Sequence, residues 1–281
     1  MNQSRINIIL KSGSAVIACL VLFLIGNKSL AASSYIILAS TTSTVNSGLF
    51  ESILPVFTQN SGISVRVVGV GTGQAIKIAE RGDADVLLVH HRISELAFVD
   101  KGFGVRRHDV MYNDFILVGP KGDPAKIQST QNVVQAYRKI AASKSIFVSR
   151  GDDSGTHKKS LEIWQNVPLD ISSKSRGWYR ETGSGMGATL NIANSMIGYT
   201  LSDRSTWLAF QNKGSLAILF EGDPSLRNQY GIIMVNPNRH KHVKSTLASK
   251  FISWMTGKVG QSAINRFRIN GKQSFFANAA G

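Results

Sequence analysis

The chain has 281 residues, of which 32 are Lys or Arg and 17 are Asp or Glu, giving a formal net charge of +15. Basic proteins bind nucleic acid, an anionic membrane surface or an anionic ligand. Here the basic residues are scattered, without an arginine-rich block or interleaved aromatic residues, so we expect no nucleic-acid partner. The length allows two modest lobes.

Residues 1–32 have the features of a secretory signal peptide. Arg5 and Lys11 give a basic start, residues 15–25 form a short apolar core, and small residues close the segment. That core is too short to span a membrane. The only cysteine, Cys19, lies inside the core rather than at its end, so we predict that it is removed on export. We expect a mature periplasmic protein with no disulfide and no lipid anchor.

The predicted elements then alternate between strand and helix. Residues 35–39 form an apolar strand that runs into five consecutive hydroxyl residues, 40–44. Residues 63–70 predict a second strand, which ends in a Gly-Thr-Gly-Gln turn at 71–74, and residues 85–89 predict a third. Strands that alternate with helices predict a parallel sheet, and ligands bind at the carboxyl ends of such strands. The hydroxyl run and the Gly-Thr-Gly turn both lie at that edge.

Apolar residues at helical spacing predict the helices that cover this sheet. One stripe runs from Leu49 to Phe57, with Ser47 as its predicted N-cap. Stripes around Phe251 and Ile264 predict two further helices near the end of the chain.

Two extended segments are predicted to cross between the lobes. Residues 109–119 form the first crossover strand and residues 230–235 the return. We therefore assign residues 33–113 and 231–281 to the first lobe and residues 114–230 to the second.

The most informative segment is the turn at Ser149–His157. It connects a predicted strand at 145–148 to a predicted helix whose N-cap is Asp153 or Ser154. A helix N-terminus presents free N–H groups and the positive end of the helix dipole, and Arg150 adds a cation with a fork of donors. The turn therefore predicts an anion site, although an ordinary capped helix with a solvated arginine fits this stretch equally well.

Other candidate sites have simpler interpretations. The Gly71–Gly73 turn lacks the third glycine of a dinucleotide-binding fingerprint, so we predict no nucleotide cofactor. His90 and His91 are adjacent, which is a poor spacing for two ligands of one metal, so we predict no metal site. The glycines of 183–187 open a predicted helix, and we interpret them as packing glycines.

Six blocks of the sequence match, in order, the motifs of one known family. The blocks are Leu38–Val45, Val70–Ala75, Gly82–His90, Val110–Pro120, Ser149–His157 and Glu181–Gly187. With them the chain resembles the tungstate-binding proteins that serve ABC importers. The resemblance implies the type II periplasmic binding protein fold, in which two lobes, each a mostly parallel sheet flanked by helices, are joined by two crossover strands.

The resemblance also implies which residues bind the oxyanion. They come from the hydroxyl run, the Gly-Thr-Gly turn and the central turn, and they are Thr41, Thr42, Ser43, Thr72, Arg150 and Thr156. The chain departs from the family at Ser40, where Thr is usual, and at Asn46, where an acid is usual. Because Ser40 keeps a hydroxyl, these departures bear on selectivity and affinity.

The function implied is that of a periplasmic solute-binding protein. It captures tungstate or molybdate between its lobes and delivers the anion to the ABC permease and ATPase subunits of the inner membrane. A buried dianion needs many hydrogen-bond donors around it, and the proposed segments supply them. We expect a monomer that needs no cofactor and catalyses no reaction.

Two alternatives stay open. Residues 150–156 also resemble the anion turn of phosphate-binding proteins, and phosphate near neutral pH carries a proton that needs an acceptor, such as Asp152 or Asp153. An exported enzyme acting on a phosphorylated substrate would need a general base within reach of the cleft. Only His90, His91 and His157 are candidates for that role.

Overall fold

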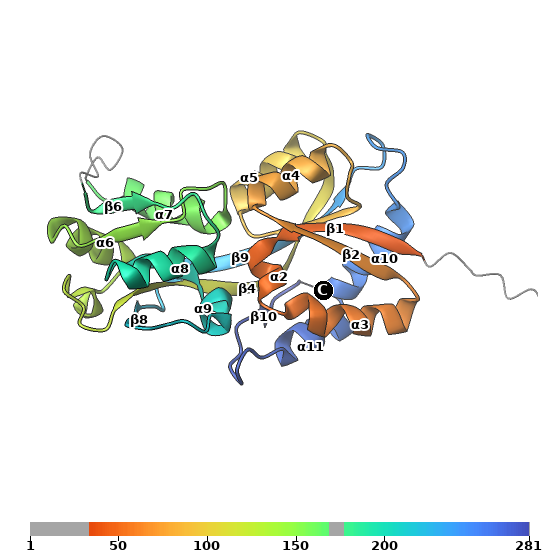
Figure 1. The fold of residues 1–281 in the computed structure, drawn as a ribbon. Helices are drawn as coiled ribbons and strands as arrows, with labels where there is room; N and C mark the ends of the chain where they lie inside the picture. Colours follow the sequence, from red (N-terminus) through yellow and green to blue (C-terminus); the bar gives the residue numbers. More distant parts are fainter. Residues whose placement is uncertain (1–33, 169–176, 281) are drawn as a thin grey trace, which may run out of the picture. The chain divides into compact units, whose positions relative to one another are not determined.

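The computed structural model describes residues 34–168 and 177–280 (Figure 1). The predicted signal peptide, with Cys19, lies outside the described residues. The strands are β1 Tyr35–Thr41, β2 Ser64–Val70, β3 Val86–Val89, β4 Gly104–Pro120, β5 Phe147–Ser149, β6 Tyr179–Glu181, β7 Thr200–Asp203, β8 Leu216–Phe220, β9 Arg227–Val235 and β10 Phe276–Ala277. The α-helices are α2 Thr42–Asn46, α3 Leu49–Ser61, α4 Thr72–Glu80, α5 Arg92–Asp100, α6 Val133–Ala142, α7 Gly155–Gln165, α8 Met186–Ser195, α9 Arg204–Ala209, α10 Ser245–Thr256 and α11 Lys258–Arg266. Among these described helices, none has the length and apolar character that a membrane crossing requires.

The strands before β4 form the parallel part of the main sheet. β1 lies between β2 and β3 and runs parallel to both, as the alternation of strands and helices predicts. β9 pairs antiparallel with β3, and β4 pairs antiparallel with β9, so the sheet order is β10-β4-β9-β3-β1-β2. The carboxyl ends of β1, β2 and β3 therefore share one edge. We call β1, β2 and β3, together with the parts of β4 and β9 that pair beside them, β10, α2 to α5, α10 and α11, the first lobe.

Helices cover both faces of this sheet. On one face, Phe57 of α3 and Phe251 of α10 pack edge to face, with ring centroids 5.0 Å apart, against Leu38 of β1. On the other face, Phe98 of α5 packs onto Leu87 of β3. Successive residues of a strand point to opposite faces, so both sides of these apolar strands are buried.

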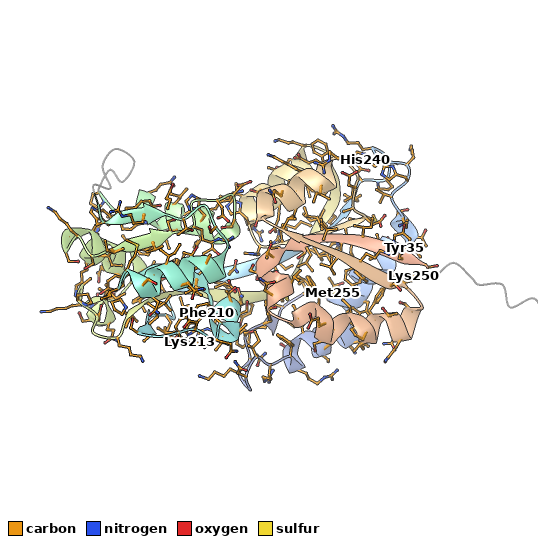
Figure 2. All side chains as sticks on the ribbon, viewed as in Figure 1. Tyr35, Phe210, Lys213, His240, Lys250 and Met255 are labelled. Carbon is orange, nitrogen blue, oxygen red and sulfur yellow. The ribbon has the colours of Figure 1, made fainter. Side chains whose placement is uncertain are left out.

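The predicted helices near the end of the chain are confirmed as α10 and α11. Met255 of α10 is fully buried, whereas Lys250 of the same helix is exposed (Figure 2). Ile264 of α11 is likewise fully buried. Each of the two helices thus packs its apolar side against the core of the first lobe.

A second lobe is built around the C-terminal half of β4. β7 and β8 pair antiparallel with that half, while β5 and β6 form a parallel pair. Its core is aromatic, because Tyr137 of α6, Phe147 of β5 and Trp164 of α7 pack with ring centroids between 4.5 and 5.1 Å apart. Residues of α6 and β8 complete this core.

The two predicted crossover strands lie side by side. β4 and β9 pair antiparallel from Gly104↔Val235 to Asp114↔Arg227 (Figure 1). β4 has 17 residues and is longer than the segment predicted at 109–119. It takes part in the sheets of both lobes, so the backbone at its centre connects them.

The start of the first lobe differs from the prediction. A short helix, α2, begins inside the hydroxyl run, with Thr41 as its N-cap. Ser47 is therefore the C-cap of α2 and not the N-cap of α3, a position that Gly48 occupies. Gly48 has φ +79°, a conformation that glycine adopts without strain, and this lets the chain turn between the two helices.

Candidate functional site

The central turn connects β5 to α7, as predicted. Of the two predicted N-caps, Ser154 is right, since its Oγ accepts a hydrogen bond from His157 N–H at 3.1 Å. Gly151 has φ +63°, and a Cβ at this position would come within 2.7 Å of the Glu181 side chain. Glycine thus allows the turn to pass close to β6.

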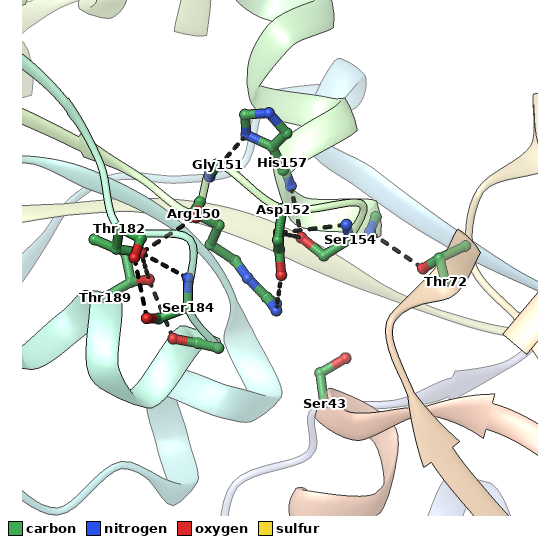
Figure 3. A network of polar contacts seen from close by, with 12 residues as sticks. Ser43, Thr72, Arg150, Gly151, Asp152, Ser154, His157, Thr182, Ser184 and Thr189 are labelled. Atoms are coloured by element: carbon green, nitrogen blue, oxygen red, sulfur yellow. Dashed lines mark hydrogen bonds and ion pairs between the residues drawn. The ribbon is translucent and has the colours of Figure 1, made fainter. Parts of the chain in front are cut away.

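Arg150 is the cation of this turn, and its side chain is only 10% exposed. Its Nη2 donates to Asp152 Oδ2 at 2.6 Å, and Ser154 Oγ donates to Asp152 Oδ1 at 2.6 Å (Figure 3). Arg150 Nε is buried and has no hydrogen-bond partner among the described residues. One donor of the guanidinium is therefore available to a ligand.

The hydroxyl run does not act as a uniform set of donors. Ser40 Oγ donates to Leu88 O at 2.7 Å, which occupies its proton in the sheet. Thr41 Oγ1 lies 2.7 Å from Thr44 Oγ1 and 3.1 Å from Ser43 Oγ, so it belongs to the cap of α2. Thr42 is exposed and Ser43 is half-buried in the first turn of that helix.

The Gly-Thr-Gly turn meets the central turn directly. Thr72 Oγ1 accepts a hydrogen bond from Gly155 N–H at 3.1 Å (Figure 3). Gly73 N–H donates to Asp153 O at 3.2 Å. The N-termini of α4 and α7, from different lobes, are thus held next to each other.

All six predicted site residues line one small cavity. Its volume is about 10 Å³, close to that of a single water-sized sphere. The lining residues are Thr41, Thr42, Ser43, Val70, Gly71, Thr72, His90, Arg150, Ser154, Gly155 and Thr156. Thr156 Oγ1 is buried and finds no partner within residues 34–168 and 177–280. Of these described lining residues, none is an acid.

A larger cavity of about 410 Å³ adjoins this one through shared lining residues. It includes Asp152 and Asp153 as well as the glycine-rich turn at 183–187. Our interpretation of these glycines as packing glycines is wrong. A Cβ at Gly183 or Gly185 would meet nothing within 4 Å, so the turn faces open space instead of a neighbouring element.

His90 was not predicted as a site residue, although it lines the small cavity. It follows β3 at the carboxyl edge of the sheet and is 6% exposed. Burial, which outweighs the attraction of the Asp203 carboxylate, lowers the pKa of His90 to about 4. Its position after a buried strand was the available signal, but we considered it only as a metal ligand or a general base and not as part of an anion site.

The site is suited to binding an anion. Two helix N-termini, one arginine and several hydroxyls converge on it, and all of them stabilise negative charge. In the described part of the chain, no group of three or more His, Cys, Asp or Glu side chains is placed to hold a metal ion.

Comparison with known proteins gives consistent results. A family model described as a PBP superfamily domain matches residues 27–259. The tungstate-binding protein TupA of Peptoclostridium acidaminophilum is 45% identical over 244 residues, covering 86% of this chain and 83% of the relative. TupA of Campylobacter jejuni is 39% identical over 241 residues, covering 84% of this chain and 88% of the relative. The structure of TupA from Desulfovibrio alaskensis G20 matches with a TM-score of 0.79 at 44% identity, covering 88% of this chain and all of that one. The predicted resemblance and the type II periplasmic binding protein fold are confirmed. The expectation of mostly parallel sheets is wrong, because β4, β7, β8, β9 and β10 all form antiparallel pairs.

Proposed function

We propose that this chain, which belongs to the PBP superfamily and within it to the family of tungstate-binding proteins, binds tungstate or molybdate and passes it to an ABC permease. The anion binds in the small cavity, with Thr41, Thr42, Ser43, Thr72, Arg150 and Thr156 as the side-chain ligands.

The observation that carries this proposal is the donor character of the small cavity. A fully deprotonated dianion has only acceptor oxygens, and an acid beside it would repel it. The cavity offers an unpaired Arg150 Nε and an unpaired Thr156 hydroxyl, and no acid among its described lining residues. Desolvation of the dianion is offset only where such donors surround it.

Binding requires movement of the lobes or of the lining side chains. A tetrahedral oxyanion needs more room than a cavity of about 10 Å³ provides. We place the lobe boundaries at 33–113 with 231–281 and at 114–230, because the buried residues of each core fall within one of these two sets, except Tyr230, which packs in the core of the first lobe. Hinged movement about the centres of β4 and β9 then opens and closes the site.

The cellular setting follows from the same family membership. We infer a periplasmic protein that acts as a monomer and delivers its ligand to permease and ATPase subunits. No covalent chemistry is required of it, and the relatives above are named for binding and not for catalysis.

Calorimetric titration of residues 33–281 with tungstate, molybdate, sulfate and phosphate tests the proposal. We expect one tungstate or molybdate per chain and no comparable heat from phosphate. Ligand at a hundred times its dissociation constant should also raise the unfolding free energy by about 2.7 kcal/mol. Arg150→Ala should abolish most of the affinity, whereas Arg138→Ala, at an exposed position of α6, is the matched control. An unchanged melting temperature in millimolar tungstate would reject the proposal.

Phosphate is the second candidate, because two acids lie near the site. Asp152 and Asp153 line the adjoining larger cavity, where the carboxylate of either could accept a hydrogen bond from the P–OH group of hydrogen phosphate. Tight phosphate binding that is lost in Asp152→Asn or Asp153→Asn would favour this alternative over tungstate.

A further inference from the structure

A chain of hydrogen bonds leads from the small cavity into the boundary between the lobes. His90 Nδ1 lies 3.0 Å from Asn228 Oδ1, and Asn228 Nδ2 donates to Asn113 Oδ1 at 2.6 Å. Asn113 Nδ2 in turn contacts Ser205 Oγ at 3.4 Å, and Ser205 Oγ donates to Asp203 Oδ1. All five residues are at most 6% exposed.

The donors of these hydrogen bonds all point in one direction. Because the amide of Asn228 uses its Nδ2 to reach Asn113, it presents its oxygen to His90, so Nδ1 of His90 must carry a proton. Every following donor also points away from His90 and towards the buried carboxylate of Asp203. In the neutral ring, Nε2 is therefore the nitrogen without a proton.

The surroundings of His90 are shared by the cavity and the crossover strands. Its ring stacks on Tyr230 of β9, with centroids 4.7 Å apart, and a Cβ at Gly155 of α7 would come within 2.8 Å of it. The charged and titratable groups that act on it are Asp203, which favours its protonated form, and Arg150 and His91, which oppose it.

We propose that His90 takes up a proton from solvent when the oxyanion binds, so that the neutral imidazole becomes a cationic donor inside the small cavity. This inference rests on the proposed function, since it needs an anion in that cavity. The proton adds to Nε2, and the chain that ends at Asp203 stabilises the imidazolium through Nδ1–H.

Charge compensation gives the physical reason. In the ligand-free protein, burial keeps His90 neutral at pH 7, since its pKa is lowered to about 4. A bound dianion places two negative charges beside the ring, where Arg150 alone does not balance them. These charges raise the pKa of His90, and affinity then increases as the pH falls.

Titration calorimetry with molybdate in buffers of different ionisation enthalpy measures the proton uptake. We expect the wild-type protein to take up a fraction of a proton at pH 7.5 and a larger fraction at pH 6.5, with a lower apparent Kd at pH 6.5. His90→Gln should bind with no uptake. His242→Gln is the matched control, because His242 lies in the loop before α10 and does not line the small cavity. This variant should keep the wild-type proton uptake.

The outcomes separate the two proposals. Heat of binding with no dependence on the buffer would overturn the role of His90 and leave the proposed function standing, whereas no heat from tungstate or molybdate would overturn both. An uptake that persists in His90→Gln would assign the proton to another group. The ring Cε1–H resonance of His90, followed by NMR between pH 5 and 8 with and without molybdate, gives a readout that needs no variant. An unchanged titration of this resonance would also reject the proposal.

Discussion

Thr156→Val separates the ligand contacts of the site from its structural contacts. Thr156 Oγ1 is buried without a partner among the described residues, so its hydroxyl does not contribute to the stability of the ligand-free protein. An unsatisfied buried hydroxyl costs about 1–3 kcal/mol. Valine keeps the branched shape and removes that hydroxyl, and we therefore expect the unfolding free energy to rise by about 1 kcal/mol.

The same substitution should weaken binding. A hydrogen bond to a charged partner contributes about 1.5–3 kcal/mol, which corresponds to a roughly 10- to 150-fold rise in Kd for tungstate. Stability and affinity should thus change in opposite directions. Urea denaturation of the ligand-free variant and calorimetric titration with tungstate measure the two quantities.

Thr189→Val is the control for this pair of measurements. Thr189 is fully buried, and its Oγ1 donates to Gly185 O at 3.1 Å and contacts Thr182 Oγ1 at 3.0 Å. Its loss should lower the unfolding free energy by about 1–2 kcal/mol and leave the affinity unchanged. If Thr156→Val lost stability as this control does, and kept its affinity, the assignment of Thr156 to the ligand would be refuted.

Three further substitutions and a change of pH test the charges of the site. Arg150→Ala should cost about 2–5 kcal/mol of tungstate affinity by titration, and Arg150→Lys should recover part of it, because lysine keeps the charge but not the fork. Asp152→Asn weakens the contact of Arg150 Nη2, because an amide oxygen replaces a carboxylate, and removes a negative charge, so tungstate titration should show equal or tighter binding, and a tenfold loss would contradict the donor-only site. Because the folded-state pKa of His90, about 4, lies below its ordinary 6.5, its contribution to stability is complete above pH 6.5 and is lost as the pH falls towards 4. The loss amounts to about 3 kcal/mol, and urea denaturation across this range should show it in the wild type and not in His90→Gln.

Local signals were sufficient to predict much of the central turn. The strand and the helix N-cap depend on a few neighbouring residues, so the sequence predicts the strand to within two residues and narrows the N-cap to Asp153 or Ser154, of which Ser154 is right. The parallel order of β1, β2 and β3 followed from the alternation of strands and helices. The candidate ligand residues came from a resemblance covering nearly the whole chain after residue 32.

The remaining features depend on contacts between distant residues. His90 reaches Asn228, 138 residues away, and Asn228 reaches Asn113, 115 residues away, so no local pattern distinguishes His90 from any other histidine. Ser40 was grouped with the other hydroxyl residues, but strand pairing turns it towards Leu88 O. Which residues of a polar run face the ligand is decided by the register of the sheet.

We infer that Thr72 connects binding to lobe closure. Its oxygen accepts the N–H of Gly155 from the other lobe, which leaves the hydroxyl proton free to point into the small cavity. Without ligand, the two direct hydrogen bonds between the turns contribute only about 1 kcal/mol each, because both partners are hydrated when the lobes separate. In the proposed function, an oxyanion that accepts from Thr72 on one side and from Arg150 on the other contacts both lobes only when they are closed, and we expect this differential affinity to shift the population towards the closed arrangement.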